Sequence, residues 1–523
     1  MKNLSGTKLD EIDGGSPADF DMLVVGGGVN GAGIARDAAG RGYRLLLVEQ
    51  DDLAGHTSSA STKLIHGGLR YLEYGEFRLV RESLIERDRL WRMAPHIIWP
   101  LRFILPQTLS PRPAWMVRLG LFLYDHLGGR KALPATKTVA LDHSPFGDGL
   151  ADRRGRAFLY SDCWVDDSRL VVLNALDAGE RRALVRTRTR LLRARRDGAV
   201  WRATIGDARG EQEVRARILV NAAGPWVSDV IGRAGLHSDP AVRLVKGSHI
   251  VVPRLYEGDH AFTLQNADRR IVFAIPYEGR FTLIGTTEED WTGPPGKAQI
   301  DDAEIGYLLD TAARYFARPP KREDICWSYA GIRPLYDDKA GRSSAVTRDY
   351  VLDLDSDGPP LLSIFGGKIT TYRRLAEQAL NLLAAQGIET RGAWTGEAKL
   401  PGGDMAQGGV DALAASLRDQ YPALPGALLR RLARAYGSRA PELLGRAQRL
   451  DDLGGTFGSD LTRAEVDYLV SKEWARTAED ILFRRSKLGL HVPPDAVDRL
   501  SAYLKGPVRN LSEERPTPLQ EKE

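Results

Sequence analysis

Three glycines near the start of the chain have the spacing of a nucleotide-binding turn. Gly26, Gly28 and Gly31 form the pattern GxGxxG, and an acidic residue, Glu49, follows about 20 residues later. In this pattern the first glycine permits a tight turn, the second lets backbone N–H groups approach a pyrophosphate, and the third lets a helix pack on a strand. The carboxylate accepts a hydrogen bond from a ribose 2′-hydroxyl and repels a 2′-phosphate. The spacing predicts a dinucleotide site that does not take NADP.

The segments around these glycines have the patterns of a strand, a helix and a second strand. Residues 20–25 form an apolar run, residues 31–41 follow as a helix, and residues 43–49 form a strand that ends at Glu49. Such a unit points the helix N-terminus at the phosphates, whose charge it stabilises. The alternative is a glycine turn in an unrelated α/β fold, but the surrounding elements favour the nucleotide site.

The glycine turn alone does not distinguish NAD from FAD, but three later stretches favour FAD. Residues 58–71 combine clustered hydroxyls with paired glycines, which suits a loop wrapped on an extended cofactor. Residues 365–371 form another strand-to-helix turn, where Lys368 suits negative charge at the flavin N1/O2 edge. Residues 218–226 end a third strand in a glycine. The predicted cofactor contacts are Gly26, Gly27, Gly28, Asn30, Gly31, Glu49, Ser58, Ser59, Ser61, Thr62, Lys63, His66, Gly67, Gly68, Gly224, Pro225, Trp226, Gly366, Gly367, Lys368 and Thr370.

Composition excludes several classes of protein. The 523 residues are 43% hydrophobic and 27% charged, which is typical of a globular chain of more than one domain. The net charge is only +4 and the signs are interspersed, so we expect no nucleic-acid partner. The two cysteines, Cys163 and Cys326, form no CxxC, which argues against an iron–sulfur cluster, a zinc ribbon or a dithiol pair. We expect no metal, no signal peptide and no transmembrane segment, so that any membrane contact is peripheral.

The pattern changes along the chain in a way that predicts its domains. Residues 271–277 and 280–286 have the pattern of a hairpin, and a strand at 361–364 precedes a helix at 369–386. Residues 410–505 are nearly all amphipathic helix. The FAD part is expected to be discontinuous, over 19–75, 155–235 and 330–393. We expect an N-terminal extension over 1–18, an FAD- and substrate-binding domain over 19–393, a helical domain over 400–510 and a disordered tail over 511–523.

Specific motifs extend along nearly the whole chain: GGGVNGAG, SSASTKLIHGGLRYLE, YSDCWVDDSRLV, NAAGPWV, KGSHIVVP, IGTT, AGIRPL, TRDY and FGGKITTYR. Together they resemble the aerobic FAD-dependent glycerol-3-phosphate dehydrogenases of bacteria. The resemblance implies an α/β fold: a Rossmann-like FAD-binding domain with an interleaved antiparallel-sheet substrate domain of the glycine/D-amino-acid oxidase type, and a C-terminal all-helical domain. It also implies oxidation of sn-glycerol 3-phosphate to dihydroxyacetone phosphate by hydride transfer to flavin N5, with the electrons passed to membrane quinone.

A phosphorylated substrate needs cationic side chains. Arg70, Arg333 and Arg348 lie in motifs otherwise rich in small residues, and arginine contacts phosphate through two N–H groups at once. Arg333 is the strongest candidate of the three for a phosphate contact, because its segment, GIRPL, is too apolar for a solvated face. The residues that the resemblance places around substrate and flavin are Arg70, Tyr71, His249, Arg333 and Lys368.

The reaction also needs a base near the substrate C2 hydroxyl. His249 is the first candidate because the free pKa of histidine lies near neutrality, and Lys368 is its rival. A satisfied histidine inside a strand over residues 248–252 is an equally good interpretation of His249. We therefore take His249, Arg333, Lys368 and Arg70 as the candidate catalytic residues.

The route of the electrons is less clearly marked. No second GxGxxG follows a strand, so the acceptor is a quinone, oxygen or a protein. Residues 93–127 mix Trp, Phe, Leu and Ile with isolated Arg, which suits either a segment in the membrane interface or a buried core helix. The resemblance to quinone-reducing enzymes favours the membrane. We therefore expect a peripheral protein on the cytoplasmic side of the inner (plasma) membrane or in the cytoplasm, and a homodimer is compatible with the sequence.

Two other functions compete with this one. The first is a related FAD oxidase that uses oxygen on an amine or phosphate substrate. The second is a flavin-binding protein of RNA modification, suggested only by the pI near 8.9 and disfavoured by the lack of a basic stripe.

The acidic run at 353–358 starts like a calcium-binding loop but has Ile364 at the twelfth position, so we interpret it as a turn between strands.

Overall fold

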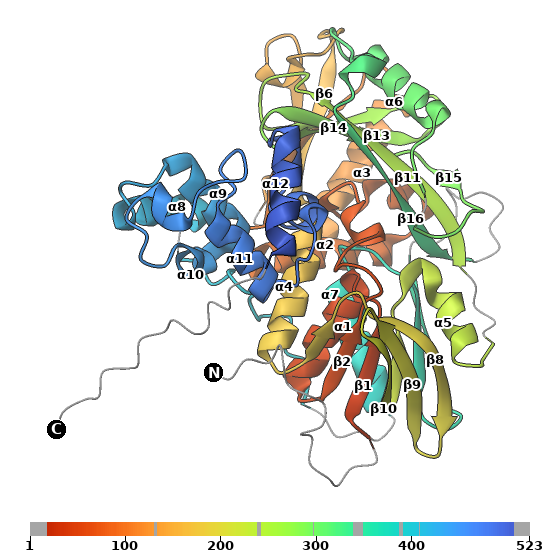
Figure 1. The fold of residues 1–523 in the computed structure, drawn as a ribbon. Helices are drawn as coiled ribbons and strands as arrows, with labels where there is room; N and C mark the ends of the chain where they lie inside the picture. Colours follow the sequence, from red (N-terminus) through yellow and green to blue (C-terminus); the bar gives the residue numbers. More distant parts are fainter. Residues whose placement is uncertain are drawn as a thin grey trace.

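The computed structural model describes residues 18–129, 133–237, 242–296, 298–337, 349–385, 391–406 and 408–506. These residues form two large β-sheets, each with helices on its faces, and a group of helices from the C-terminal part of the chain (Figure 1). In Figure 1 the sheet that contains β1 lies below the sheet that contains β11, and helices α8–α11 lie to one side, in blue. The fold class expected from the sequence is confirmed.

The first sheet carries the glycine turn. Its strand order is β17-β18-β10-β1-β2-β7, and all neighbours except β17 and β18 are parallel. A parallel sheet needs both faces covered, and its strands are therefore apolar on both sides. Helices α1, α4, α5 and α7 cover this sheet, and β9 and β8 extend it from β10. The elements are β1 (Phe20–Val25), α1 (Val29–Arg41), β2 (Leu45–Val48), α4 (Asp167–Glu180), β7 (Leu184–Arg186), β8 (Arg190–Asp197), β9 (Val200–Asp207), β10 (Gly210–Asn221), α5 (Val227–Arg233), β17 (Tyr350–Asp355), β18 (Leu361–Gly366) and α7 (Tyr372–Ala384).

The predicted elements of this sheet are present, with shifted ends. The strand at 20–25 is confirmed, but the first helix begins at Val29 rather than Gly31, because Gly28 is extended and caps it. The helix expected from residue 369 begins only at Tyr372, after a buried turn. The acidic run at 353–358 lies at the end of β17 and in the turn to β18, which pairs with it in antiparallel register.

The second sheet is mostly antiparallel. Its order is β15-β11-β14-β13-β12-β4-β6-β3, with β16 paired to β11 and β5 to β6. Helix α6 packs on one face of this sheet, and α2 and α3 pack on the other. The predicted hairpin is confirmed, since Tyr277 pairs with Phe281. The elements are β3 (Leu64–Ile65), η3 (Leu69–Tyr74), α2 (Phe77–Met93), β4 (Ile98–Pro106), α3 (Ala114–Leu127), β5 (Lys137–Ala140), β6 (Arg156–Val165), β11 (Val242–Pro253), β12 (Ala261–Gln265), β13 (Ile271–Tyr277), β14 (Phe281–Gly285), β15 (Glu289–Asp290), α6 (Asp302–Tyr315) and β16 (Trp327–Tyr336).

The interpretation of residues 93–127 as one membrane segment is wrong in its first half. Strand β4 lies inside the second sheet, between β12 and β6. Phe103 is 1% exposed and stacks on Tyr160 at 5.2 Å between ring centroids, and Trp99 contacts the Arg434 guanidinium of the helical domain. Only the second half, with Leu109 and helix α3, keeps large apolar side chains at the surface. An apolar strand and an interfacial helix have similar compositions, and only the strand pairing separates them.

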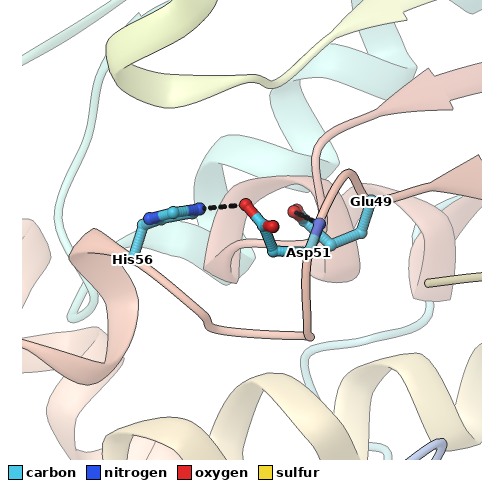
Figure 2. Close-up of side chains that lie close together, drawn as sticks. All are labelled: Glu49, Asp51 and His56. Atoms are coloured by element: carbon cyan, nitrogen blue, oxygen red, sulfur yellow. Dashed lines mark hydrogen bonds and ion pairs between the residues drawn. The ribbon is translucent and has the colours of Figure 1, made fainter. Parts of the chain in front are cut away.

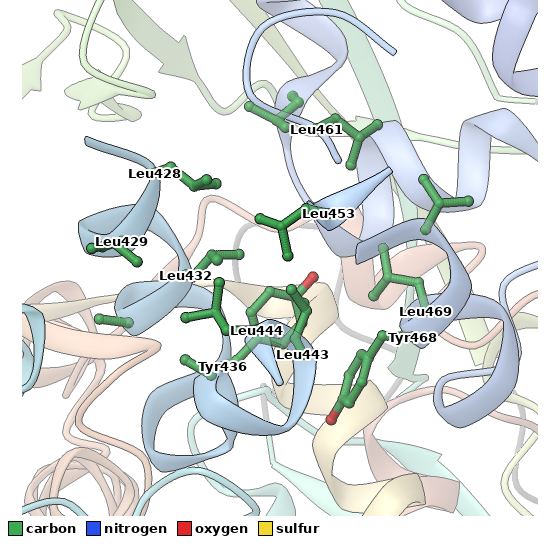
Figure 3. Packing of buried hydrophobic residues seen from close by; sticks show 14 of the residues in the cluster. Leu428, Leu429, Leu432, Tyr436, Leu443, Leu444, Leu453, Leu461, Tyr468 and Leu469 are labelled. Carbon is green, nitrogen blue, oxygen red and sulfur yellow. The ribbon is translucent and has the colours of Figure 1, made fainter. Parts of the chain in front are cut away.

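The C-terminal part is helical, as expected. Helices α8 (Gly409–Gln420), α9 (Gly426–Tyr436), α10 (Ala440–Leu444), α11 (Arg463–Lys472) and α12 (Pro494–Lys505) surround an apolar cluster (Figure 3). In Figure 3, Leu432 and Tyr436 of α9 face Leu453 and Leu469 across this cluster. A π-helical turn, η10 (Asp480–Arg485), follows α11. We call residues 408–506 the helical domain.

Candidate functional site

The glycine turn is built as the sequence predicts. Gly26 has a φ of +112°, and a Cβ at this position would clash with the carbonyl oxygen of Ala222 at the end of β10. A Cβ at Gly31 would clash with the carbonyl oxygen of Gly26. Both positions therefore require glycine. In the first turn of α1 the Val29 N–H donates to Ser58 Oγ at 3.0 Å, and the N–H groups directly after it have no partner within the helix and can donate to an anion.

Glu49 lies at the end of β2, directly beside this turn. Its Oε2 accepts from the N–H of Gly27 at 2.6 Å and its Oε1 from the N–H of Asp51 at 2.8 Å, and burial raises the pKa of its carboxyl. Figure 2 shows Asp51 between Glu49 and His56, whose Nε2 is 2.8 Å from Asp51 Oδ2. The three side chains lie close enough to hold an ion, but these hydrogen bonds already use the facing atoms. We assign them to orienting Glu49.

A cavity of about 630 Å³ runs from the glycine turn to the second sheet. Most residues predicted from the sequence meet along its wall. They are Gly26, Gly28, Asn30, Glu49, Ser58, Ser61, Thr62, His66, Gly68, Arg70, Tyr71, Gly224, Pro225, Trp226, Arg333, Gly366, Gly367, Lys368 and Thr370. The structure therefore brings residues from seven separate stretches of the sequence into one site.

Five other predicted cofactor contacts do not line this cavity. Among the described residues, Gly27, Gly31, Lys63 and Gly67 do not line the cavity, and Ser59 lines a smaller neighbouring cavity of about 300 Å³. Lys63 is buried, and its Nζ contacts both carboxylate oxygens of Asp167, at 2.9 and 3.0 Å. Arg348 lies outside the described residues.

The shape and polarity of the cavity fit an extended dinucleotide. At one end the start of α1 offers backbone donors and Glu49 offers an acceptor for a ribose hydroxyl. Asn30 joins the two glycine turns, since its Nδ2 donates to the Gly366 carbonyl at 3.2 Å. Its buried Oδ1 has no hydrogen-bond partner among the described residues, as expected of a group that faces a bound molecule. The residues present therefore fit the FAD expected from the sequence.

Three cationic side chains, Arg333, Lys368 and Arg70, line the same cavity. Arg333 Nη2 donates to Thr286 Oγ1 at 2.8 Å, and a Cβ at Gly247 would clash with the same guanidinium, so glycine leaves room for it. The Lys368 ammonium lies 3.8 Å from the centre of the Tyr71 ring. Arg70 Nη1 lies 3.6 Å from the Glu288 carboxylate. Clustered cations of this kind suit a dianionic group such as a phosphate monoester.

Two of the residues that hold these cations were missed by the sequence analysis. Thr286 and Glu288 face the cavity, while Thr287 between them is buried. Thr287 Oγ1 donates to Glu304 of α6 at 2.6 Å and accepts from the N–H of Ser248 at 2.8 Å. This anchor fixes the segment from which Thr286 contacts Arg333. The IGTT motif contains Thr286 and Thr287, but its sequence carries no sign of which side chain faces the cavity.

Two histidines are candidates for the proton acceptor. His249 is fully buried behind the wall, where its Nε2 is 3.0 Å from Thr62 Oγ1 and its ring stacks on Tyr329. His66 lines the cavity itself. Burial and nearby cations, Arg333 and Lys63, place the pKa of His249 well below its usual value, and burial next to Lys368 lowers the pKa of His66 to about 4. Both imidazoles are therefore neutral at pH 7, and the same burial and cations make each a weaker base than a solvated histidine.

Comparison with known proteins adds to this geometry. Residues 21–373 match the family of FAD-dependent oxidoreductases, and residues 393–505 match the C-terminal domain of α-glycerophosphate oxidase. The chain is 53% identical over 480 residues to D-erythritol 1-phosphate dehydrogenase of Brucella abortus, covering 91% of this chain and 96% of that protein. It is 53% identical over 490 residues to glycerol-3-phosphate dehydrogenase of Pseudomonas aeruginosa (93% and 95%). With the aerobic glycerol-3-phosphate dehydrogenase of Escherichia coli it shares 50% over 492 residues (92% and 97%).

A solved structure has the same fold over nearly the same length. The glycerol-3-phosphate dehydrogenase from Bacillus halodurans, complexed with FAD, superposes with a TM-score of 0.69 at 26% identity. The match covers 90% of this chain and 86% of that one. An α-glycerophosphate oxidase from Mycoplasma pneumoniae with FAD bound has a TM-score of 0.57 at 18% identity, over 73% of this chain and 99% of that one, which is a likeness of fold.

Proposed function

The chain belongs to the family of FAD-dependent oxidoreductases, and from this premise we propose that it oxidises sn-glycerol 3-phosphate to dihydroxyacetone phosphate. The observation that carries this proposal is the group of three cations, Arg70, Arg333 and Lys368, lining a cavity that fits FAD. Relatives at 50% identity or more that are named for this substrate support it. Turnover of glycerol 3-phosphate with an electron-accepting dye, without peroxide in air, tests the dehydrogenase against a related oxidase.

Different side chains bind the substrate phosphate, face the cofactor and accept the proton in this proposal. Arg333 and Arg70 hold the phosphate, and Thr286 fixes the Arg333 guanidinium before the substrate arrives. Lys368 lies in the turn before α7 and lines the cavity, where its positive charge would stabilise negative charge on the reduced cofactor. FAD, when bound, supplies the hydride acceptor for the substrate C2 carbon. We assign the acceptance of the C2 hydroxyl proton to His249 Nε2, through the hydroxyl of Thr62.

This proton route predicts a pattern among three variants. Thr62→Val and His249→Gln are each expected to lower kcat about 100-fold, the lower end of what general-base catalysis contributes, while KM changes little. His66→Gln is expected to lower kcat far less. Steady-state kinetics on samples with equal FAD content provide the measurement. If His66→Gln lowers kcat about 100-fold and Thr62→Val leaves kcat almost unchanged, the proton is accepted by His66 instead.

We further propose that the protein binds the membrane surface peripherally, on its cytoplasmic side, and delivers electrons to quinone there. Among the described residues, no helix is both long and apolar enough to cross a membrane. Instead, large exposed apolar side chains gather on η3, α2 and α3, and four of them, Tyr74, Phe77, Met116 and Leu119, also line the cavity that holds the proposed site. We call this set the apolar patch: Tyr74, Phe77, Leu109, Trp115, Met116, Leu119 and Phe122. A quinone entering from the lipid meets the cavity here.

Three residues of the apolar patch should control membrane binding. Leu109, Trp115 and Phe122 are 48%, 71% and 50% exposed and do not line the cavity, so serine at these positions costs the fold and the site little. Each loses about 1–2 kcal/mol of transfer into lipid, so the triple variant should bind vesicles at least about 100-fold more weakly. Sedimentation with lipid vesicles measures this, with dye-linked activity unchanged. Val497→Ser, at an exposed position of α12, is the control. Equal vesicle binding by the triple variant and the control contradicts the proposal.

A second substrate has a specific observation in its favour. D-Erythritol 1-phosphate dehydrogenase is as similar to this chain as the glycerol-3-phosphate enzyme is, at 53% identity. The two substrates share a phosphate monoester and a neighbouring secondary alcohol, so the same three cations serve both. The ratio of kcat/KM for the two phosphates decides between them.

A further inference from the structure

One segment of the FAD cavity is tied to the helical domain at both of its ends. The segment runs from Asp51, just after β2, to Lys63, just before β3, and we call it the flavin loop. Many of its residues line the cavity: Ala54, Gly55, His56, Thr57, Ser58, Ala60, Ser61 and Thr62. Ser58 Oγ also accepts from the Val29 N–H, in the first turn of α1, at 3.0 Å. The position of this loop therefore sets the width of the cofactor site.

The first end of the loop is attached through Asp52. This carboxylate is 2% exposed and receives both terminal nitrogens of Arg485, each at 2.9 Å. Arg484 Nε donates to the same carboxylate at 2.8 Å. Both arginines belong to the π-helical turn η10 of the helical domain, more than 400 residues away in the sequence. Arg485 is itself locked in place by the Glu473 carbonyl, to which its Nη2 donates at 2.8 Å.

The second end is attached through Lys487. Its Nζ donates to Ser168 Oγ at 2.7 Å and lies 3.5 Å from the carboxylate of Asp167. Asp167 in turn accepts from Lys63 Nζ and from Ser61 Oγ, at 2.8 Å for the latter, and all of these groups are buried or nearly so. One short segment of the helical domain, residues 484–487, thus contacts one end of the flavin loop directly, at Asp52, and the other end through Asp167 of α4.

We propose that the helical domain positions the flavin loop for FAD through these two attachments, which we call the latch: Arg485–Asp52 and Lys487–Asp167. The latch residues act through the loop and touch no cofactor themselves. When Arg485 is removed, Asp52 keeps Arg484 and Arg188 as partners. When Lys487 is removed, Asp167 keeps Lys63. Each carboxylate therefore stays paired but loses one of the contacts that fix its position, and the end of the loop that it holds shifts. The prediction is that the affinity for FAD depends on the helical domain, and that this dependence is separate from the stability of the domain.

The test compares FAD binding in variants of the full chain that lose similar stability. Arg485→Met and Lys487→Met remove the latch charges with little change in side-chain volume. Arg431→Met is the matched control, because Arg431 pairs with Asp460 and Glu465 inside the helical domain and does not contact the loop. The dissociation constant for FAD is measured by titrating apoprotein and following the quenching of flavin fluorescence. The melting temperature of each apoprotein, and the visible circular dichroism of bound flavin, are recorded with it.

The latch variants are expected to bind FAD about 10- to 100-fold more weakly, the range typical of residues that orient a ligand's direct contacts. Arg431→Met is expected to melt earlier but to bind FAD as the wild type does, and Lys487→Arg should recover most of the affinity. If Lys487→Met does not fold, Ser168→Ala removes only the hydroxyl that Lys487 contacts and should still weaken FAD binding several-fold. The proposal is overturned if the latch variants lose no more FAD affinity than Arg431→Met. The inference rests on FAD lying along the flavin loop; a wild-type chain that binds no FAD would contradict that premise, whatever the variants do.

Discussion

Replacing Arg333 with alanine is expected to lower kcat/KM for glycerol 3-phosphate by about 30- to 1,000-fold. The guanidinium lines the cavity, is held by Thr286 and makes a charge-assisted contact with the substrate phosphate in our proposal. Losing such a contact costs about 2–4 kcal/mol of transition-state binding. Arg333→Lys should recover only part of the activity, because the bidentate geometry is lost. Steady-state kinetics with equal FAD content provide the measurement.

The comparison with unphosphorylated glycerol makes this result specific. Glycerol lacks the group that Arg333 binds, so its poor rate should barely change in the variant. Arg270→Ala is a matched control, because Arg270 also lines the cavity but is paired with Asp268 and packs on the Tyr307 ring. An equal loss of rate on both substrates would assign Arg333 to the fold or to the flavin rather than to the phosphate.

Replacing Gly31 with alanine is expected to abolish tight FAD binding. A single methyl group at this position would overlap the carbonyl oxygen of Gly26, a backbone atom of the turn itself. The turn has to open to relieve this overlap, and overpacking of this kind costs about 1–3 kcal/mol. The affinity for FAD should fall about 10- to 100-fold, since each 1.4 kcal/mol is a factor of ten. Purified protein should be nearly colourless.

A second glycine provides the control for this substitution. Gly232 lies in α5, and a Cβ built there meets no atom within 4 Å. Gly232→Ala should keep its FAD and gain a little stability, because alanine suits a helix better than glycine. The flavin-to-protein absorbance ratio and the dissociation constant for FAD are measured on both variants. Normal FAD content in Gly31→Ala would show that the glycine turn does not contact the cofactor as proposed.

The parts of this site that depend on local backbone geometry could be predicted from the sequence. The clash that excludes a side chain at Gly31 involves a carbonyl five residues away, so the spacing of the glycines carries the information. The apolar neighbours of Arg333 likewise indicated that it does not lie on a solvated face, and it lines the cavity. In both cases the physical requirement lies within a few residues of the position, where a pattern can record it.

Other features depend on partners that are distant in the sequence and leave no local pattern. Glu288 approaches Arg70 only because the segment that follows β14 and the turn η3 both border the cavity. Arg485 contacts Asp52 across 433 residues of sequence. The prediction that residues 98–106 lie in the membrane interface was wrong for the same reason. Their apolar composition does not indicate that β6 and β12 pair with them on either side. Such contacts follow from the packing of whole sheets and domains.

Reduction of the bound flavin by substrate in the absence of oxygen tests the central claim most directly. The purified protein is mixed anaerobically with glycerol 3-phosphate, and the visible flavin absorption and the dihydroxyacetone phosphate formed are followed together. Our account predicts that the flavin band bleaches, that one dihydroxyacetone phosphate forms per flavin reduced, and that glycerol at the same concentration leaves the band unchanged. A flavin that stays oxidised with glycerol 3-phosphate, and with D-erythritol 1-phosphate, would contradict it.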